Sequence, residues 1–198
     1  VKRGLYYLTR SMNVSKRGGA LWEPGGTMYS HGLASIALCE AYGMTQDPAL
    51  SSPAQQALDY IMYVQDPVGG GWRYGVRQPG DTSVVGWQVM ALKSGHMAYL
   101  RVNASNVRGA IRFLDNVQSD AGSAYGYTRP GQGEATTAVG LLCRMYLGWK
   151  LDNQALARGV SQLAQLGPQP DDYYYNYYAT QVLFHYTGGV GPMWEEWD

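Results

Sequence analysis

One acidic residue, Asp81, stands where a helix is expected to begin, and a carboxylic acid in such a place could act as a proton donor. It follows Pro79-Gly80 and precedes Thr82-Ser83. A catalytic acid needs neighbouring groups that keep it protonated beside the reacting atom. A lone Asp at a helix start is more often a cap, because its carboxylate is favoured by the backbone N–H groups there. We therefore treat Asp81 as a cap and only as a weak candidate for a catalytic residue.

The cysteines and histidines do not have the pattern of a metal site. Cys39 and Cys143 both lie in apolar helical runs and are interpreted as small buried residues. A zinc site needs three or four converging ligands, but the repeat register described below places His31 and His185 roughly 10 Å apart along parallel helices. His31 is expected to be a hydrogen-bonded interior residue. No metal and no cofactor are expected.

A larger candidate site lies in the long connections between helical runs. These connections are rich in glycine and proline, and each carries aromatic and charged residues. If they all precede the same class of helix in a parallel array, they gather at one rim. Aromatic rings among alternating charges suit a polar ligand or a protein partner, although packing between repeats and a solvated salt-bridge network would explain the same residues. The predicted binding rim consists of Trp22, Glu23, Arg73, Tyr74, Arg77, Asp81, Tyr127, Arg129, Glu134, Asp172 and Tyr173.

The elements that would position these residues recur along the chain. Gly32, Gly86 and Gly140 are spaced 54 residues apart, and each opens a similar apolar run. A fixed long period indicates one supersecondary unit that is used repeatedly.

The apolar pattern predicts an all-α fold of eight main helices in two alternating classes. Amphipathic helices, which carry most of the charges, are expected over residues 2–12, 54–65, 104–118 and 154–166. Helices that are nearly apolar on all sides, and therefore buried on all sides, are expected over residues 32–42, 84–92 and 138–147, and the run 176–186 belongs to the same set. This alternation predicts a curved array with an inner and an outer layer.

Capping residues set the expected ends of these helices. The predicted N-terminal signals are Tyr29-Ser30, Ser52 before Pro53, Asp81 to Ser83, Thr136-Thr137, and Asp152 or Asn153. The predicted C-terminal glycines are Gly43, Gly95, Gly148 and Gly188.

A sequence motif repeats together with these helices. Its best copy runs from Ala57 through Tyr60-Ile61 and Gln65 to Gly70-Gly71-Trp72, and a second runs from Arg108 to Tyr125. The motif resembles the glutamine–tryptophan repeat of squalene and oxidosqualene cyclases. Two further copies match the motif less well, and together the four copies cover most of the chain. The resemblance implies the α/α toroid of the prenyltransferase and squalene-cyclase-like repeat family. About four hairpins would form a single toroid domain over residues 1–198, whole or partial, excised from a longer protein.

The same motif contains residues that are expected to be structural. A Gln at the end of an outer helix can hydrogen-bond the backbone groups that are left unpaired there, and the aromatic residue stacks on it. We interpret this set as staples between adjacent repeats, formed by Gln65, Trp72, Gln118 and Tyr125.

The reactive groups of the family are not intact. Cyclases of this type protonate an alkene with an Asp-x-Asp-Asp-Thr motif, and Gly80 stands at the position of the proton donor. Protein prenyltransferases bind zinc through an Asp-x-Cys pair, and Ser83 stands at the position of the thiolate. We therefore expect a non-catalytic or undetermined module that binds a ligand or a protein, or a structural repeat segment that completes a ring with the rest of a parent chain. The alternative is a terpenoid cyclase or prenyltransferase-type enzyme whose catalytic groups are supplied elsewhere.

Composition narrows the range of partners. Fifteen basic residues balance fifteen acidic ones, so there is no basic footprint for nucleic acid. No apolar run approaches the roughly 20 residues that cross a bilayer. The expected partners are an isoprenoid-like or other small molecule, a protein partner, the remaining repeats of a parent chain, or a second copy of this chain.

Overall fold

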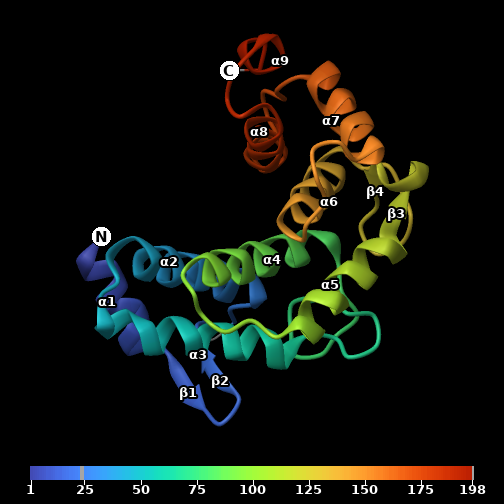
Figure 1. The fold of residues 1–198 in the computed structure, drawn as a ribbon. Helices are drawn as coiled ribbons and strands as arrows, with labels where there is room; N and C mark the ends of the chain where they lie inside the picture. Colours follow the sequence, from blue (N-terminus) through green and yellow to red (C-terminus); the bar gives the residue numbers. More distant parts are fainter. Residues whose placement is uncertain (23–24, 198) are drawn as a thin grey trace. The chain divides into compact units, whose positions relative to one another are not determined.

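The chain is mostly helical. The computed structural model describes residues 1–22 and 25–197, which divide into two compact units, Val1–Ala110 and Ile111–Asp198. The described residues form nine α-helices and four short strands (Figure 1). The all-α class is confirmed, and the strands, which pair as two small antiparallel ladders, are additions to the prediction. None of the described helices combines the length and apolarity that a membrane span requires.

The first unit contains the elements up to the start of α5. They are α1 (Lys2–Ser11), β1 (Asn13–Ser15), β2 (Gly18–Ala20), α2 (Met28–Thr45), α3 (Pro48–Val64), α4 (Thr82–Met97) and the first turns of α5 (Ala104–Val117). The second unit contains the rest of α5, β3 (Gln118–Ser119), a short 3-10 helix η1 (Asp120–Gly122), β4 (Ala124–Tyr125), α6 (Glu134–Tyr146), α7 (Gln154–Leu166), α8 (Tyr173–Thr187) and α9 (Pro192–Glu195).

Several helix starts differ from the predictions because an earlier capping group takes the position. α3 begins at Pro48, whose preceding Asp47 accepts a hydrogen bond from the Ala49 N–H at 2.9 Å, and Pro53 lies inside the helix. Asp47-Pro48 is the same kind of cap–proline pair as the predicted Ser52-Pro53, and it acts one and a half turns earlier. The N-cap of α2 is Thr27 instead of Tyr29-Ser30.

Other caps follow the local chemistry of the connections. Asp81, Asn153 and Gly188 cap as predicted. Gly133 caps α6, because the hydroxyls of Thr136 and Thr137 bond to the backbone of Tyr125. Gly43 and Gly95 are inside helices and are not C-caps, whereas Gly148 follows the last turn of α6 with φ 110°.

In the first unit, α2 packs against both α3 and α4 (Figure 1). Gly32 allows α2 and α4 to approach closely, because a Cβ at this position would lie 2.7 Å from Nε2 of Gln88. α4 is buried along most of its length, as predicted, but α2 is not. Leu33 and Met44 on α2 are 48% and 80% exposed, so the expectation that all inner helices are covered on every side is wrong for α2. It is also wrong for α8, where Tyr177 and Phe184 are 45% and 48% exposed.

In the second unit, α6 packs against α8, and α7 contacts both of them. Gly140, which is the third glycine of the period, lies against the Tyr125 ring. A Cβ at Gly140 would lie 2.3 Å from the Tyr125 ring. Gly32 and Gly140 therefore both mark close contacts, although the neighbouring group differs between the two repeats.

The first predicted staple joins α3 to the connection that follows it and to α5. The side-chain amide of Gln65 donates to the carbonyl oxygens of Gly70 and Asn106, at 2.7 and 2.9 Å, and accepts from the Asn106 side chain at 2.6 Å. Trp72, which is 1% exposed, donates its indole N–H to the carbonyl of Ile61 at 2.8 Å. The Trp72 bond satisfies a carbonyl group near the C-terminus of α3. The Gln65 amide instead bonds carbonyl groups of the following connection and of α5, so the prediction that it serves unpaired backbone groups at its own helix end is wrong.

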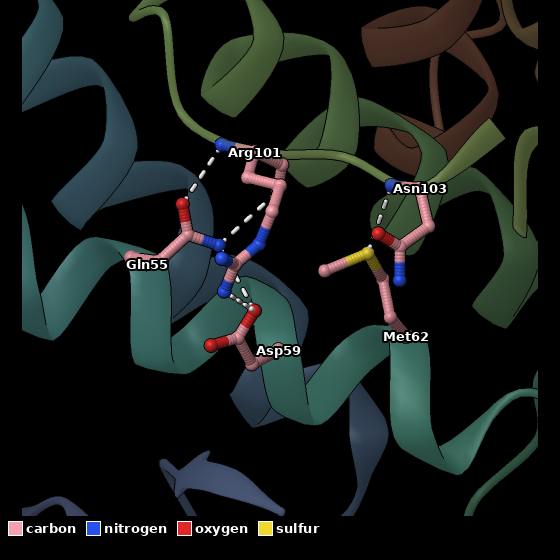
Figure 2. A network of polar contacts seen from close by, with 5 residues as sticks. All are labelled: Gln55, Asp59, Met62, Arg101 and Asn103. Carbon is pink, nitrogen blue, oxygen red and sulfur yellow. Dashed lines mark hydrogen bonds and ion pairs between the residues drawn. The ribbon is translucent and has the colours of Figure 1, made fainter.

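A second network holds the segment that leads into α5 against α3 (Figure 2). The Gln55 amide pairs with both backbone groups of Arg101, accepting at 2.8 Å and donating at 3.1 Å. Arg101 also forms an ion pair with Asp59 at 3.5 Å, and the Asn103 N–H donates to the sulfur of Met62 at 3.2 Å. These contacts bond the segment just before α5 to α3, in addition to the contacts that Gln65 makes with Asn106 in the first turn of α5.

We expect Gly70→Ala to destabilise the protein strongly. Gly70 has φ 82°, and a Cβ there would lie 2.1 Å from the Gly109 carbonyl oxygen. An alanine at this position would therefore have a strained φ angle, and the backbone at Gly70 or Gly109 would also have to move. A loss of about 3 kcal/mol in the free energy of unfolding is expected in urea denaturation. Gly25→Ala is the matched control, since Gly25 has φ 83° with no atom within 4 Å, and should cost about 1 kcal/mol. Equal losses would contradict the staple.

Candidate functional site

Asp81, the weak candidate for an acid, is a buried N-cap. Its Oδ1 accepts from the Val84 N–H at 2.9 Å, and its Oδ2 lies 3.7 Å from Nε of Arg73. The side chain of Asp81 is completely buried. A helix N-terminus and a guanidinium both favour the negative carboxylate, which is the opposite of what a proton donor needs. The structural environment therefore suits a capping anion.

The rim residues of the first unit fall around the connection between α3 and α4. Arg73 stacks over the ring of Tyr74, with its guanidinium carbon 5.6 Å from the ring centroid. Tyr74 lies 6.1 Å from Tyr29 between ring centroids, and its carbonyl accepts from the N–H of Met28 at the start of α2. Arg73, Tyr74 and Asp81 therefore come together as predicted. Glu23 lies outside the described residues.

Trp22 borders a groove of about 630 Å³ in the first unit. The groove is enclosed by α1, the segment after β2, and the first turns of α2, and its lining residues are Tyr7, Leu8, Ser11, Leu21, Trp22, Gly25, Gly26, Ser30 and Ala34. A second hollow of about 550 Å³ shares Trp22, Gly25 and Gly26 with it and reaches Asn13 and Tyr74 to Val76. The Trp22 ring is anchored edge-to-face against Tyr60, at 5.5 Å between centroids.

Arg77 belongs to a different cluster, which we call the arginine–tyrosine cluster and define as Arg17, Tyr63 and Arg77. The guanidinium carbons of Arg17 and Arg77 lie 4.7 and 4.8 Å from the centroid of the Tyr63 ring. Each such contact contributes about 0.5–1 kcal/mol at an exposed position. Sequence reasoning missed Arg17 and Tyr63, although the Gly18-Gly19 pair beside Arg17 is a turn signal.

His31 is an interior residue, as the sequence predicts. It is fully buried, its Nδ1 accepts from the Leu21 N–H at 3.0 Å, and its Nε2 lies 3.1 Å from the Ala57 carbonyl oxygen. These two partners select the neutral tautomer that carries its proton on Nε2. Burial lowers the pKa of His31 to about 4, and the hydrogen bond to Ala57 opposes this shift. The ring is therefore a neutral link between α2, α3 and the segment after β2.

Both cysteines are buried, and burial raises the pKa of each thiol to about 12. A thiol that stays protonated is a poor metal ligand and a poor nucleophile. Across residues 1–22 and 25–197, no group of three or more His, Cys, Asp and Glu side chains is arranged to hold a metal ion.

The remaining rim residues belong to the second unit and are Tyr127, Arg129, Glu134, Asp172 and Tyr173. Asp172 caps α8 by accepting from the Tyr175 N–H at 2.8 Å. Burial, followed by the charges of Glu134 and Asp172, raises the pKa of Tyr175 to about 12. Tyr127 and Arg129 are exposed on the connection before α6, and Tyr173 is 81% exposed. The predicted rim is thus distributed over both units.

The second predicted staple is built around a buried arginine, which the sequence did not indicate. Gln118 and Tyr125 are directly paired residues of β3 and β4, and both accept hydrogen bonds from Arg144, at 3.1 and 2.9 Å. Arg144 also pairs with Asp115 at 2.6 Å and stacks over Trp149. The Gln118 side chain therefore accepts a hydrogen bond from the guanidinium of Arg144, whereas the Gln65 side chain donates hydrogen bonds to backbone carbonyl oxygens.

Comparison with protein-family models, with curated proteins and with solved structures finds no match for this chain.

The environment of Asp81 predicts a small loss of stability for one variant and a larger loss for another. Asp81→Asn keeps an acceptor for the Val84 N–H and loses the ion pair with Arg73, so it should cost about 0.5 kcal/mol. Asp81→Ala leaves this buried N–H without its cap and should cost about 2 kcal/mol. Urea denaturation measures both losses. If the two variants lost equal stability, capping would not be the role of Asp81.

The free energy of unfolding should fall as pH decreases from 7 to 5. The pKa of His31 is about 4 in the folded chain, against an ordinary value of 6.5, so the unfolded chain binds the proton first and folding is opposed in acid. The stability is fully present above pH 6.5 and is lost as pH falls toward 4. The expected loss between pH 7 and 5 is roughly 2 kcal/mol, from denaturant unfolding at each pH.

His31→Gln should be less stable at pH 7 but should lose this part of the pH dependence. His96→Gln, at an exposed position, is the control and should keep it. NMR titration of the His31 ring gives a second measurement, and protonation near pH 6.5 would contradict the buried neutral state.

Proposed function

We propose that this chain is a non-catalytic binding module that holds an apolar small molecule in the groove beside Trp22. The groove itself is the observation that supports the proposal. Its volume of about 630 Å³ lies within the usual range of small-molecule sites, roughly 300–1,000 Å³. The aromatic and aliphatic lining, which includes Tyr7, Leu8 and Trp22, favours a hydrocarbon ligand.

The polar groups of the groove narrow the class of ligand. Ser11 and Ser30 line it together with the backbone of Gly25 and Gly26, and hydroxyl or peptide groups can bond one polar end of an otherwise apolar molecule. An isoprenoid-like alcohol has this combination of an extended hydrocarbon and a single polar end.

For the architecture, we propose the α/α toroid that the repeat motif implies, as a single domain, whole or partial. Within the first unit α2 packs on α4 with α3 beside them, and within the second α6 packs on α8 with α7 beside them. The repetition of this arrangement supports alternating inner and outer layers. The exposed apolar side chains of α2 support a covering partner, which would be the remaining repeats of a parent chain or a second copy.

A terpenoid cyclase or prenyltransferase activity ranks below binding. Asp81 is occupied as the cap of α4 and by Arg73, so an enzyme would need its acid or metal from outside this segment. Of the two functions, binding requires no group beyond those that line the groove.

The test uses farnesol as the probe and fluorescence or equilibrium dialysis as the measurement. Ala34→Phe fills the groove from α2 and should weaken farnesol binding at least tenfold, because the added ring occupies space that the ligand needs. Ala37→Phe adds the same group to an exposed position of the same helix outside the lining and should bind farnesol normally.

Equal affinity of the two variants would place farnesol elsewhere and refute the groove as its site. If the unchanged chain failed to bind farnesol up to its solubility limit, the isoprenoid-like ligand class would be wrong.

A further inference from the structure

We propose that the arginine–tyrosine cluster of Arg17, Tyr63 and Arg77 is a binding site for a tetrahedral oxyanion, such as a phosphate group. The site lies in the first unit, is formed by residues other than those that line the groove, and does not rest on the function proposed above.

Two cations from separate segments converge on one ring. Arg17 comes from the turn between β1 and β2, and Arg77 comes from the connection between α3 and α4. Both guanidinium carbons lie within 5 Å of the centroid of Tyr63. The two guanidinium carbons are therefore less than about 10 Å apart, and attraction to the same ring holds both of them there. An anion that bridges them would remove their mutual repulsion.

Within the part of the chain that the structure describes, no carboxylate forms an ion pair with Arg17 or Arg77. The arginines that do form ion pairs there are Arg73 with Asp81, Arg101 with Asp59 and Arg144 with Asp115.

The carboxylates nearest to Tyr63 along α3 are already occupied. Asp59 pairs with Arg101, and Asp66, just past the helix end, accepts from the N–H groups of Val68 and Gly69. Lys16 adds a third exposed positive charge beside Arg17. The local field at the cluster is therefore positive.

The backbone holds both arginines in position before any ligand binds. Gly18, with φ 109°, lets the hairpin approach α3 so closely that a Cβ would lie 2.4 Å from the backbone nitrogen of Tyr60. This contact sets the position of the neighbouring Arg17. Arg77 has φ 54°, its N–H donates to the Val64 carbonyl at 2.8 Å, and its Nε donates to the Tyr63 carbonyl at 3.3 Å. A preorganised site loses less conformational entropy when it binds.

The donor set selects an oxyanion with several oxygens. A guanidinium presents planar, forked N–H donors that match phosphate, sulfate or carboxylate. Arg77 uses Nε on the protein backbone, which leaves its terminal NH₂ groups for a ligand. A tetrahedral dianion can accept from two arginines at once, whereas chloride offers a single atom and a single charge.

The test titrates inorganic phosphate into the intact chain at low ionic strength, followed by calorimetry or by NMR of the protein. Saturable binding with a dissociation constant on the order of 1 mM is expected. Sulfate should compete, and chloride at the same ionic strength should compete much less, because screening alone does not depend on the shape of the anion.

Arg17→Gln and Arg77→Gly each remove one cation. Glycine is chosen at position 77 because it accepts the positive φ without strain, so the variant keeps the fold. Each change should weaken phosphate binding at least fivefold, and the double variant should show no saturable binding. Arg10→Gln is the matched control, because Arg10 stacks on a single tyrosine, Tyr6, at 5.3 Å.

The proposal is overturned if Arg17→Gln and Arg77→Gly, with unchanged far-ultraviolet circular dichroism, bind phosphate as the unchanged chain does. It is also overturned if Arg10→Gln loses as much affinity as they do, since phosphate would then respond only to net charge.

Discussion

The hydrogen bonds of the Gln65 side chain are the constraint on which the first unit depends. Gln65 ends α3 and binds the backbone of both Gly70 and Asn106, so one amide fixes the exit of α3 and the first turns of α5. The Gly70–Gly109 contact leaves no room for a side chain between these segments. Because a buried amide that lost its partners would pay the full cost of desolvation, this arrangement has little freedom to change.

The staple also sets the course of the connection between α3 and α4. Trp72 is buried against α3, and its carbonyl accepts from the N–H of Asp81 at 3.0 Å. The cap of α4 is therefore positioned by the staple. Between these points the chain turns outward, which presents Tyr74 to the second hollow beside Trp22 and Arg77 to Tyr63. A structural motif thus places the candidate binding residues without contributing to either site.

In the second unit, the corresponding segments are linked by a buried arginine instead of a glutamine amide. Arg144 enters the interior and is satisfied by Tyr125, Gln118 and Asp115 together. A buried guanidinium is tolerated only when its donors are paired, so this network is committed to packing. Arg17 and Arg77 on the surface of the first unit are different, because both are exposed to water and neither is needed to satisfy a buried group.

The sequence by itself determined the helical class, most helix positions and the residues of the Gln65 staple, because apolar periodicity and glycine or proline signals act over a few residues. It also indicated correctly that His31 is an interior residue. Helix starts were less accurate, because Asp47 and Thr27 compete with the predicted caps, and the outcome depends on which N–H groups each can reach.

Only the tertiary structure decided which rim residues meet. Arg73 pairs with Asp81, whereas Arg77, four residues later, stacks on Tyr63 together with an arginine from a distant hairpin. Nor did the sequence indicate the groove, whose walls come from α1, the segment after β2 and α2. Hydrophobic pattern sets local structure, but the close approaches at Gly18 and Gly32 decide how the elements meet, and the sites form where those elements bring side chains together.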